Sequence, residues 1–313
     1  MKGKKAVKAK KGHSEDFFGD YRDFWWNESF LKLLARRLGL DQCHSLLDVG
    51  CGQCHWSKLL VNYLGTSENE PTRVCGVDSD RKWAKGTPAL RAYFAEKGVE
   101  FELKKANADA LPYPDATFDL VTCQTLLIHV PQPKEVLAEM KRVLKPGGII
   151  LCVEPNNLVQ SLTRSSISSN DPIDEILDHV KYALLFERGK KALGQGDNSL
   201  GDLVPGMLAQ ADFENIDVRM SDKAIAMYPP YDTPEQRATM QQWRTGDRWT
   251  SDEFSDYDYF KALGPDSLEF YETYVRKYAY LSERTERYIN AQKYHAAGGA
   301  MMYVVSGTKR VES

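Results

Sequence analysis

The residues best placed to do chemistry lie around two closely spaced glycines. Gly50 and Gly52 follow a short apolar run at 45–49, and a helical pattern of apolar residues begins at Trp56. A strand, a glycine turn and a helix in this order let the backbone approach a ligand closely, because glycine has no side chain. Asp48 lies near the end of the predicted strand, where its carboxylate could face a positive group. The stretch therefore predicts a site for a small, nucleotide-like molecule.

The spacing around these glycines distinguishes between kinds of nucleotide. A dinucleotide site has the pattern G-x-G-x-x-G with an acid about 20 residues further on. Here His55 occupies the third glycine position, and the next strand-terminal acid, Asp78, lies beyond that spacing. The phosphate loop G-x-x-x-x-G-K-[ST] is absent as well. Asp48 would repel a pyrophosphate and attract an ammonium group. S-adenosylmethionine, which carries an ammonium group, a ribose diol and no phosphate, therefore fits better.

Further segments with acids or glycines at strand ends follow in a recognisable order. Together with the glycine turn they form five segments, at 48–52, 75–78, 107–112, 118–124 and 137–148. Each segment resembles a motif of class I S-adenosylmethionine-dependent methyltransferases, and the five stand in that family's order. One motif alone has little specificity, but five in order across residues 20–155 are a specific match. Cys54 is a departure, because many members have a third glycine there.

The resemblance implies a cofactor site for S-adenosylmethionine. Asp48 would face the methionine ammonium group, Asp78 would accept hydrogen bonds from both ribose hydroxyls, and Asp109 would accept one from the adenine amino group. Each acid could instead be a solvated carboxylate or a helix cap. Helices before the first motif commonly fold over the cofactor cleft in this family, although they could equally pack against the sheet. The predicted cofactor-binding residues are Tyr21, Trp25, Asp48, Gly50, Cys51, Gly52, Asp78, Ser79, Trp83, Ala108, Asp109, Ala110 and Gln124.

Two residues are candidates for catalysis on the acceptor side. His129 resembles a histidine that family members often carry near the methyl-transfer face, and it could act as a general base at neutral pH. It could also cap the next helix or pack passively. Glu154 ends the predicted fifth strand, at the carboxyl edge where open α/β sheets bind ligands. It could hold a cationic or hydroxylated acceptor, or form a turn before Pro155.

Alternating strand and helix patterns predict the fold that positions these residues. The expected class is α/β, with a doubly wound, mostly parallel, seven-stranded sheet of Rossmann-like methyltransferase type and a helical cap. Strands are expected near 45–50, 73–78, 99–104, 117–123, 148–154, 213–220 and 300–306. Helices are expected near 54–64, 80–97, 133–144, 172–193, 201–210 and 267–292, and one or two amphipathic helices within 17–38.

The last two predicted strands are far apart in the sequence. The family joins them by a short hairpin, whereas about 75 residues separate them here, far beyond the usual 2–5. Residues 226–295, together with 156–200, are therefore expected to form a helical cap on the acceptor side. Its aromatic residues, Tyr228, Tyr231, Trp243, Trp249, Tyr257 and Tyr259, could form a small core or an aromatic cage for an amine. The methyltransferase core is expected at 16–155, 201–225 and 296–310, after a disordered basic tail at 1–15.

Composition limits the partners and the compartment. A net charge of −3 argues against a general nucleic-acid binder. No apolar run reaches the roughly 20 residues of a membrane span, and no signal-peptide core follows the N-terminal lysines. The six cysteines lie in apolar runs, and Cys51-x-x-Cys54 lacks a second ligand pair for zinc. We therefore expect a cytoplasmic enzyme with reduced thiols, no metal and no membrane partner, while its oligomeric state stays open.

The predicted activity is methyl transfer from S-adenosylmethionine to a small-molecule acceptor. The resemblance implies an in-line displacement in which the enzyme supplies alignment and excludes water. One alternative is methylation of RNA or protein, which only the N-terminal lysines support. Another is a regulator that binds S-adenosylmethionine without turnover.

Overall fold

The computed structural model describes residues 19–66, 71–245, 254–298 and 301–311. Within it the chain divides into two compact units. The helical unit comprises Met1–Phe24, Arg164–Leu193 and Ile225–Ala297, and the sheet unit comprises Trp25–Thr163, Gly194–Ala224 and Gly298–Ser313. The predicted basic tail at 1–15 lies outside the described residues.

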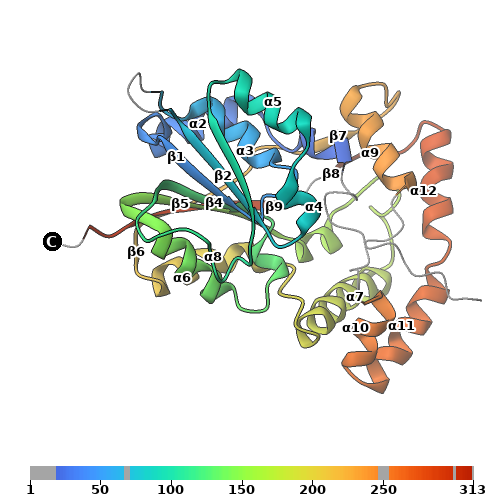
Figure 1. The fold of residues 1–313 in the computed structure, drawn as a ribbon. Helices are drawn as coiled ribbons and strands as arrows, with labels where there is room; N and C mark the ends of the chain where they lie inside the picture. Colours follow the sequence, from blue (N-terminus) through green and yellow to red (C-terminus); the bar gives the residue numbers. More distant parts are fainter. Residues whose placement is uncertain (1–18, 67–70, 246–253, 299–300, 312–313) are drawn as a thin grey trace, which may run out of the picture. The chain divides into compact units, whose positions relative to one another are not determined.

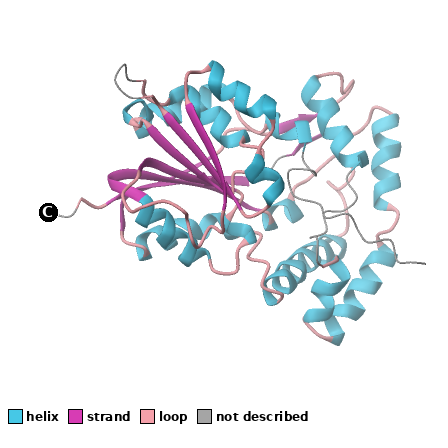
Figure 2. Ribbon diagram, in the orientation of Figure 1, coloured by secondary structure: helices cyan, strands magenta, loops and turns pink. Residues whose placement is uncertain are grey.

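A twisted seven-stranded sheet forms the centre of the sheet unit (Figures 1 and 2). Its strand order is β3-β2-β1-β4-β5-β9-β6, with β1 to β5 parallel and β9 antiparallel to both β5 and β6. This topology confirms the predicted doubly wound, mostly parallel sheet. The strands are β1 Ser45–Val49, β2 Arg73–Asp78, β3 Glu100–Lys105, β4 Phe118–Gln124, β5 Leu144–Asn156, β6 Phe213–Met220 and β9 Met301–Lys309.

Both faces of this sheet are buried, which explains why its central strands are almost continuously apolar. Leu47 and Val49 of β1 point to one face of the sheet, whereas Leu46 points to the other. Each face buries its side chains against a separate set of helices. The first face is covered by α6 (Pro133–Val143) and α8 (Val204–Gln210), and the second by α2 (Glu28–Leu38), α3 (His55–Leu60) and α5 (Pro88–Glu96).

The chain leaves β1 at the point where the strand order reverses. From there β2 lies on one side and β4 on the other, so the following loops diverge and leave space for a ligand. Asp48 is paired with Gly76 on β2 and with Thr122 on β4. Gly50 follows the last residue of β1, while Asp78 and Gln124 are the last residues of β2 and β4, so all three lie at the carboxyl ends of neighbouring parallel strands. The sheet therefore brings three predicted site residues to one edge.

The predicted helix at 80–97 is wrong as one continuous helix. It consists of α4 (Arg81–Lys85) and α5, separated at Gly86, whose φ of 65° is unfavourable for other residues. Thr87 then caps α5, since its hydroxyl accepts a hydrogen bond from the Leu90 amide at 3.1 Å. These capping signals override the longer apolar pattern.

The helical unit is built mainly from helices, with a small two-stranded sheet. The predicted helix at 267–292 is also two helices, because α11 ends at Lys277 and α12 begins at Leu281. Further elements appear within the stretch that the sequence predicted only as a cap. The unit comprises the 3₁₀ turn η1 (Gly19–Phe24), α7 (Ile173–Ala192), α9 (Pro234–Thr245), α10 (Asp256–Ala262), α11 (Pro265–Lys277), α12 (Leu281–Asn290), β7 (Ile225–Met227) and β8 (Ala296–Gly298).

Several described aromatic residues of the helical unit pack against other aromatic rings of the same unit. The ring of Trp243 lies edge-on to Tyr294, with centroids 5.6 Å apart. Tyr257 instead pairs with Tyr271 of α11, and Tyr259 with Phe186 of α7. This division supports a set of small cores over a single aromatic cage. Trp249 lies outside the described residues.

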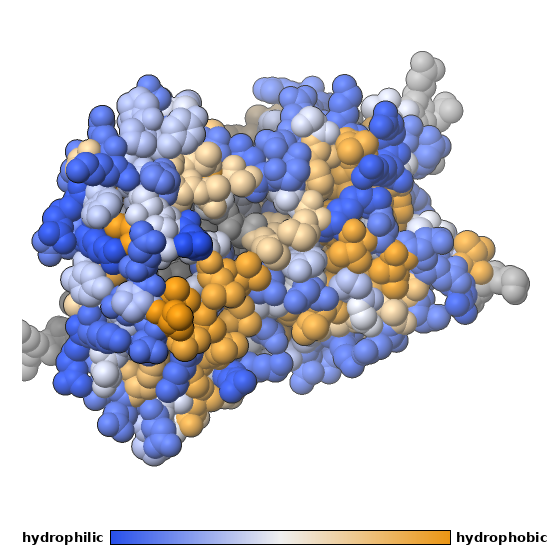
Figure 3. All heavy atoms as spheres, turned by 180° about the vertical axis from the view of Figure 1, so that it is seen from behind, coloured by the Kyte–Doolittle hydropathy of each residue, from blue (hydrophilic) through white to orange (hydrophobic). Residues whose placement is uncertain are grey.

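The surface carries several exposed apolar side chains. On α7 these are Ile173, Leu177 and Leu184, the first of them 73% exposed. Figure 3, seen from behind the view of Figure 1, shows orange hydrophobic areas among blue hydrophilic ones. In the part of the chain that the structure describes, no helix is both long and apolar enough to cross a membrane.

Candidate functional site

The loop after β1 has an unusual backbone that its glycines explain. Gly50 and Gly52 have φ angles of 70° and 49°, in the region that glycine adopts most easily. The amides of Gly50 and Cys51 both donate to the Val77 carbonyl, at 2.8 and 3.0 Å. Cys54 also lies in this left-handed region, with a φ of 59°. The chain therefore keeps the backbone that a third glycine would favour, although it has a cysteine there.

Asp78 joins the ends of the first two strands. Its Oδ2 accepts a hydrogen bond from the Gly52 amide at 3.0 Å, and its Oδ1 accepts one from the Asp80 amide at 2.8 Å. Only 5% of the residue is exposed. A carboxylate offers about four acceptor positions, so these two bonds leave capacity for two more. Asp78 can therefore hold the glycine loop and still accept hydrogen bonds from a diol.

Asp48 is almost completely buried beneath this loop. Only 1% of it is exposed, and its Oδ2 accepts a hydrogen bond from the Ser57 hydroxyl of α3. The carboxylate thus ties β1 to the helix that follows the glycine turn. Its predicted contact with an ammonium group stays a prediction. Ser57 was not predicted, because nothing in the local sequence pattern separates it from other helical serines.

Gln124 ends β4 beside the glycine loop. It is 8% exposed, and its Nε2 has no hydrogen-bond partner within the described part of the chain. A buried amide without an acceptor is costly, so such a group is usually satisfied by a ligand or water. Its position next to Asp78 and Gly50 supports the prediction that a polar ligand binds here, although the contact itself remains untested.

The loop after β3 carries the third predicted acid. The amide of Ala106 donates to the Asp78 carbonyl at 3.1 Å, so this loop starts beside the end of β2. Asp109 and Ala110 are exposed, while Ala108 is half-buried. The loop that follows the carboxyl end of β3 thus carries an exposed carboxylate, and its predicted contact with adenine stays a prediction.

Ser79 and Trp83 extend the site beyond β2. Ser79 is exposed directly after Asp78, whereas Trp83 of α4 is only 7% exposed. The ammonium group of Lys82 lies 4.2 Å from the centroid of the Trp83 ring. The ring is therefore already packed on one side, and its predicted role beside a nucleobase remains a prediction.

Cys51 contributes its backbone to the site, since its thiol lies against the sheet. A Cβ at Gly76 would come within 2.8 Å of the Cys51 Sγ. A hydrogen bond with Cys54 and burial both raise the pKa of Cys51 well above the usual thiol range. All six cysteines are buried free thiols. Cys51 is therefore a poor nucleophile and an unreactive member of the loop.

Glu154 is fully buried at the end of β5. Its Oε1 accepts hydrogen bonds from the amides of Leu126 and Leu127, at 2.9 and 2.8 Å. Burial raises the pKa of Glu154 to about 7, although these amides act in the opposite direction. This carboxylate fixes the backbone after β4, and its Oε2 has no hydrogen-bond partner within the described residues, so its predicted contact with an acceptor stays a prediction.

His129 lies on the segment that Glu154 holds. It ends the 3₁₀ turn η4 (Leu127–His129) and is half-buried. The chain passes close to this turn at Gly196, where a Cβ would lie 2.4 Å from the Ile128 carbonyl oxygen. The segment 194–200, predicted as part of the cap, therefore packs against η4 within the sheet unit. The role of His129 as a base stays a prediction.

Tyr21 and Trp25 fall in different units. Tyr21 lies in η1 of the helical unit, where burial and the nearby Glu235 raise its pKa. Trp25 begins the sheet unit and is half-buried. Its neighbour Trp26 packs on Trp56, with ring centroids 4.8 Å apart. The predicted role of Tyr21 and Trp25 in closing the site remains a prediction.

Comparison with known proteins identifies the domain. Residues 47–152 match the sequence pattern of the family described as "Methyltransferase domain". Demethylmenaquinone methyltransferase of Lysinibacillus sphaericus is 36% identical over 130 residues, covering 41% of this chain and 50% of that protein. The protein of the same name from Shouchella clausii is 38% identical over 129 residues, covering 41% and 52%. The chain thus spans about half the length of these curated relatives.

Solved structures resemble a larger part of the chain at lower identity. The YcgJ protein from Bacillus subtilis is 17% identical, with a TM-score of 0.48, and the match covers 91% of this chain and 100% of that one. Phosphoethanolamine N-methyltransferase 2 of Haemonchus contortus, solved with S-adenosyl-L-methionine, is 16% identical, with a TM-score of 0.46, covering 96% and 58%.

Proposed function

Because residues 47–152 form a class I methyltransferase domain, we propose that this chain transfers the methyl group of S-adenosylmethionine to a small-molecule acceptor. The observation that carries the proposal is the placement of Asp78. Its buried carboxylate ends β2 beside the glycine loop and retains acceptor capacity for a ribose diol. Such a pair of hydroxyls can donate two hydrogen bonds to one carboxylate.

The other predicted cofactor residues fit around the same nucleoside. The left-handed backbone at Gly50 and Gly52 is proposed to face the methionine and the ribose. Gln124 offers an amide donor without a partner in the described chain to the polar methionine end. Asp109 is exposed and can accept a hydrogen bond from the adenine amino group.

Methyl transfer itself requires few catalytic groups from the protein. When bound, the sulfonium of S-adenosylmethionine supplies an activated methyl group, which the acceptor's lone pair takes in line as the carbon–sulfur bond breaks toward sulfur. The chain's task is to hold both molecules in line and to exclude water. A proton that leaves the acceptor could pass to His129, whose half-buried ring follows β4. Glu154 would act indirectly, by holding the backbone that carries this histidine.

The acceptor class is the finer part of the proposal. The relatives from Lysinibacillus and Shouchella are named for methylation of demethylmenaquinone, which favours a quinone-type small molecule. However, the family match covers only residues 47–152, so it includes no part of the helical unit. Reduced, buried cysteines favour a cytoplasmic location.

Two measurements, made one after the other, test the proposed function. Isothermal titration calorimetry with S-adenosylhomocysteine measures binding by the full chain, and we expect a micromolar dissociation constant. Labelled S-adenosylmethionine is then incubated with quinols, RNA and protein extract in parallel. Transfer of label to the quinol fraction supports the proposal, whereas label only in RNA or protein contradicts the small-molecule acceptor.

The two alternatives give different outcomes. If RNA were the substrate, deletion of residues 1–13, which carry six lysines, would strongly reduce the rate of methyl transfer. The small-molecule proposal expects activity to be unchanged by this deletion. Binding without transfer to any fraction would favour a regulator.

A further inference from the structure

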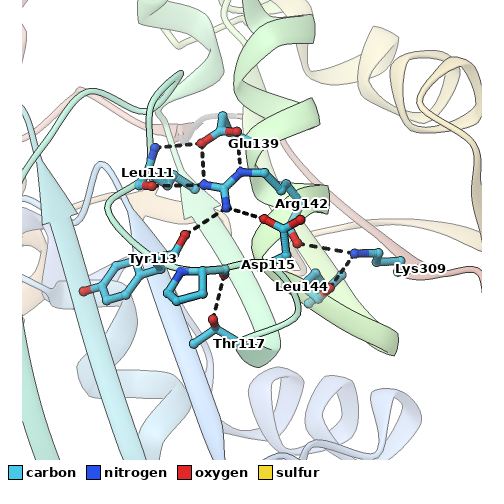
Figure 4. A network of polar contacts seen from close by, with 9 residues as sticks. Leu111, Tyr113, Asp115, Thr117, Glu139, Arg142, Leu144 and Lys309 are labelled. Carbon is cyan, nitrogen blue, oxygen red and sulfur yellow. Dashed lines mark hydrogen bonds and ion pairs between the residues drawn. The ribbon is translucent and has the colours of Figure 1, made fainter.

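The loop after β3 is held by an ion pair that lies outside the predicted site. Glu139 and Arg142 stand one turn apart on α6, and the Arg142 Nε donates to the Glu139 Oε1 at 2.7 Å. This contact lowers the pKa of Glu139 and raises that of Arg142, so both groups stay charged. Figure 4 shows the pair facing the loop at 111–117.

The ion pair forms hydrogen bonds with both the amide and the carbonyl of Leu111. The Leu111 amide donates to the Glu139 Oε2 at 2.8 Å, and the Leu111 carbonyl accepts from the Arg142 Nη2 at 3.0 Å. The Arg142 Nη1 also donates to the Tyr113 carbonyl and to Asp115, both at 2.8 Å. With the two bonds to Glu139, all five N–H donors of the guanidinium are used (Figure 4).

Glu139 and Arg142, which we call the clamp, hold the loop close to the exposed carboxylate of Asp109. Asp109 is two residues before Leu111, and the intervening turn is closed by the Ala110 amide donating to the Asn107 carbonyl at 3.1 Å. The Leu111 side chain is 5% exposed and packs into the core. The clamp and this anchor leave the backbone around Asp109 little freedom, while its carboxylate stays exposed.

We propose that Glu139 and Arg142 are positioning residues that set nucleobase selectivity by fixing the loop that presents Asp109. The inference rests on the proposed function, because it needs a nucleoside bound at this edge. A carboxylate accepts a hydrogen bond from the 6-amino group of adenine and repels the 6-oxo group of hypoxanthine. That discrimination depends on the place of the carboxylate, which a loosened loop would lose.

The test compares two ligands whose bases differ in the 6-substituent and in the hydrogen that hypoxanthine carries on N1. Dissociation constants of S-adenosylhomocysteine and S-inosylhomocysteine are measured by calorimetry for the full chain and its variants. Selectivity is the dissociation constant of S-inosylhomocysteine divided by that of S-adenosylhomocysteine. A loss of affinity that is equal for both ligands leaves this ratio unchanged. We expect Arg142→Lys, which keeps the charge but not the planar fork, to lower the ratio roughly tenfold, mainly by weakening the adenine ligand. Asp109→Ala should lower it similarly.

Lys141→Ala is the matched control on the same helix. The Lys141 ammonium group also ties backbone, donating to the carbonyls of Ala211 and Asp212 at 2.7 and 3.0 Å, but it does not touch the loop after β3. Its ratio should stay within about twofold of the unmodified chain. If Arg142→Lys does not fold, Glu139→Gln is measured in the same way, because it keeps the side chain's shape and removes the ion pair.

The outcomes separate this inference from the proposed function. Equal weakening of both ligands, or an unchanged ratio in both clamp variants, would overturn the role of the clamp alone. Failure of the unmodified chain to bind S-adenosylhomocysteine would overturn the proposed function and this inference with it.

Discussion

Two loops meet at the same edge of the sheet, yet they are held in different ways. The loop at 50–54 is held by its own backbone, which donates to Val77 and to Asp78. The loop at 106–117 is held by side chains of α6, chiefly Glu139 and Arg142. The first loop depends on particular backbone dihedral angles. The second depends on side chains that lie 28 and 31 residues after Leu111 in the sequence.

This difference shows how a single binding edge can combine two kinds of order. A loop built from positive φ angles tolerates few substitutions, because any side chain strains the backbone. A loop held by a charged clamp can accept sequence changes within itself as long as the clamp remains. The following changes break one or the other of these arrangements.

The largest expected effect is on the first loop, at Asp78. Asp78→Ala removes both the acceptor for the Gly52 amide and the proposed acceptor for the ribose. Loss of charge-assisted hydrogen bonds of this kind should weaken S-adenosylhomocysteine binding by about 100-fold, or roughly 3 kcal/mol. Asp80→Ala is the control, because Asp80 only caps α4. Unchanged affinity in Asp78→Ala would remove the proposed cofactor site.

A third loop, after β4, is held by the buried Glu154, and its test is a pH profile. The folded-state pKa of about 7 is above the ordinary value of 4.5, so the folded chain binds this proton more tightly than the unfolded chain. The resulting stability is complete below about pH 4.5 and is lost as the pH rises through 7. Glu154→Gln should remove this dependence, worth up to about 3 kcal/mol in the free energy of unfolding.

Urea unfolding of both proteins at pH 5 and pH 8 measures this contribution. The loss of stability between the two pH values should be smaller in Glu154→Gln than in the unmodified chain. Parallel profiles would mean that Glu154 is charged in the folded protein throughout this range.

A smaller effect is expected from the dihedral angles of the first loop. Gly50 has a φ of 70°, and an added Cβ would lie 2.7 Å from the Cδ1 of Leu126. The Leu126 side chain can move, but the left-handed backbone costs about 1–2 kcal/mol for a residue with a Cβ. Gly50→Ala should lower the free energy of unfolding by that amount in urea titrations. Gly206→Ala, which meets open space at ordinary φ, is the control.

The smallest effect concerns the exposed arm of the clamp. Asp115 pairs with Arg142, but 77% of the Asp115 side chain is exposed. Exposed ion pairs contribute little, so Asp115→Ala should change stability and ligand binding by less than about 0.5 kcal/mol. A loss of stability or affinity well above this value would show that Arg142 holds the loop mainly through Asp115 and not through Glu139.

Much of the fold and part of the site could be predicted from local signals. The glycines at 50 and 52 and the apolar runs before them act over a few residues, so their pattern alone indicated a strand, a turn and a helix. Asp78 was predicted because the segment 75–78 resembles the family motif whose terminal acid binds the ribose hydroxyls. The helix at 80–97 was predicted as one, since the apolar pattern concealed the capping signal at Thr87.

Other features depended on contacts that no local pattern encodes. Glu154 was predicted as an acceptor-side residue, but the fold buries it and directs it to the amides after β4. Ser57 reaches Asp48 only because α3 packs back over β1. The clamp joins Leu111 to residues of α6, the helix that follows β4.

The sequence by itself determined the order of the strands, the glycine turn and the acids at the strand ends, because backbone preferences and apolar runs act on near neighbours. Only the tertiary structure decided which charged groups are buried and which backbone amides they satisfy. The physical reason is that a hydrogen bond is set by positions in space, and residues distant in the sequence reach those positions only when the sheet and its helices have packed.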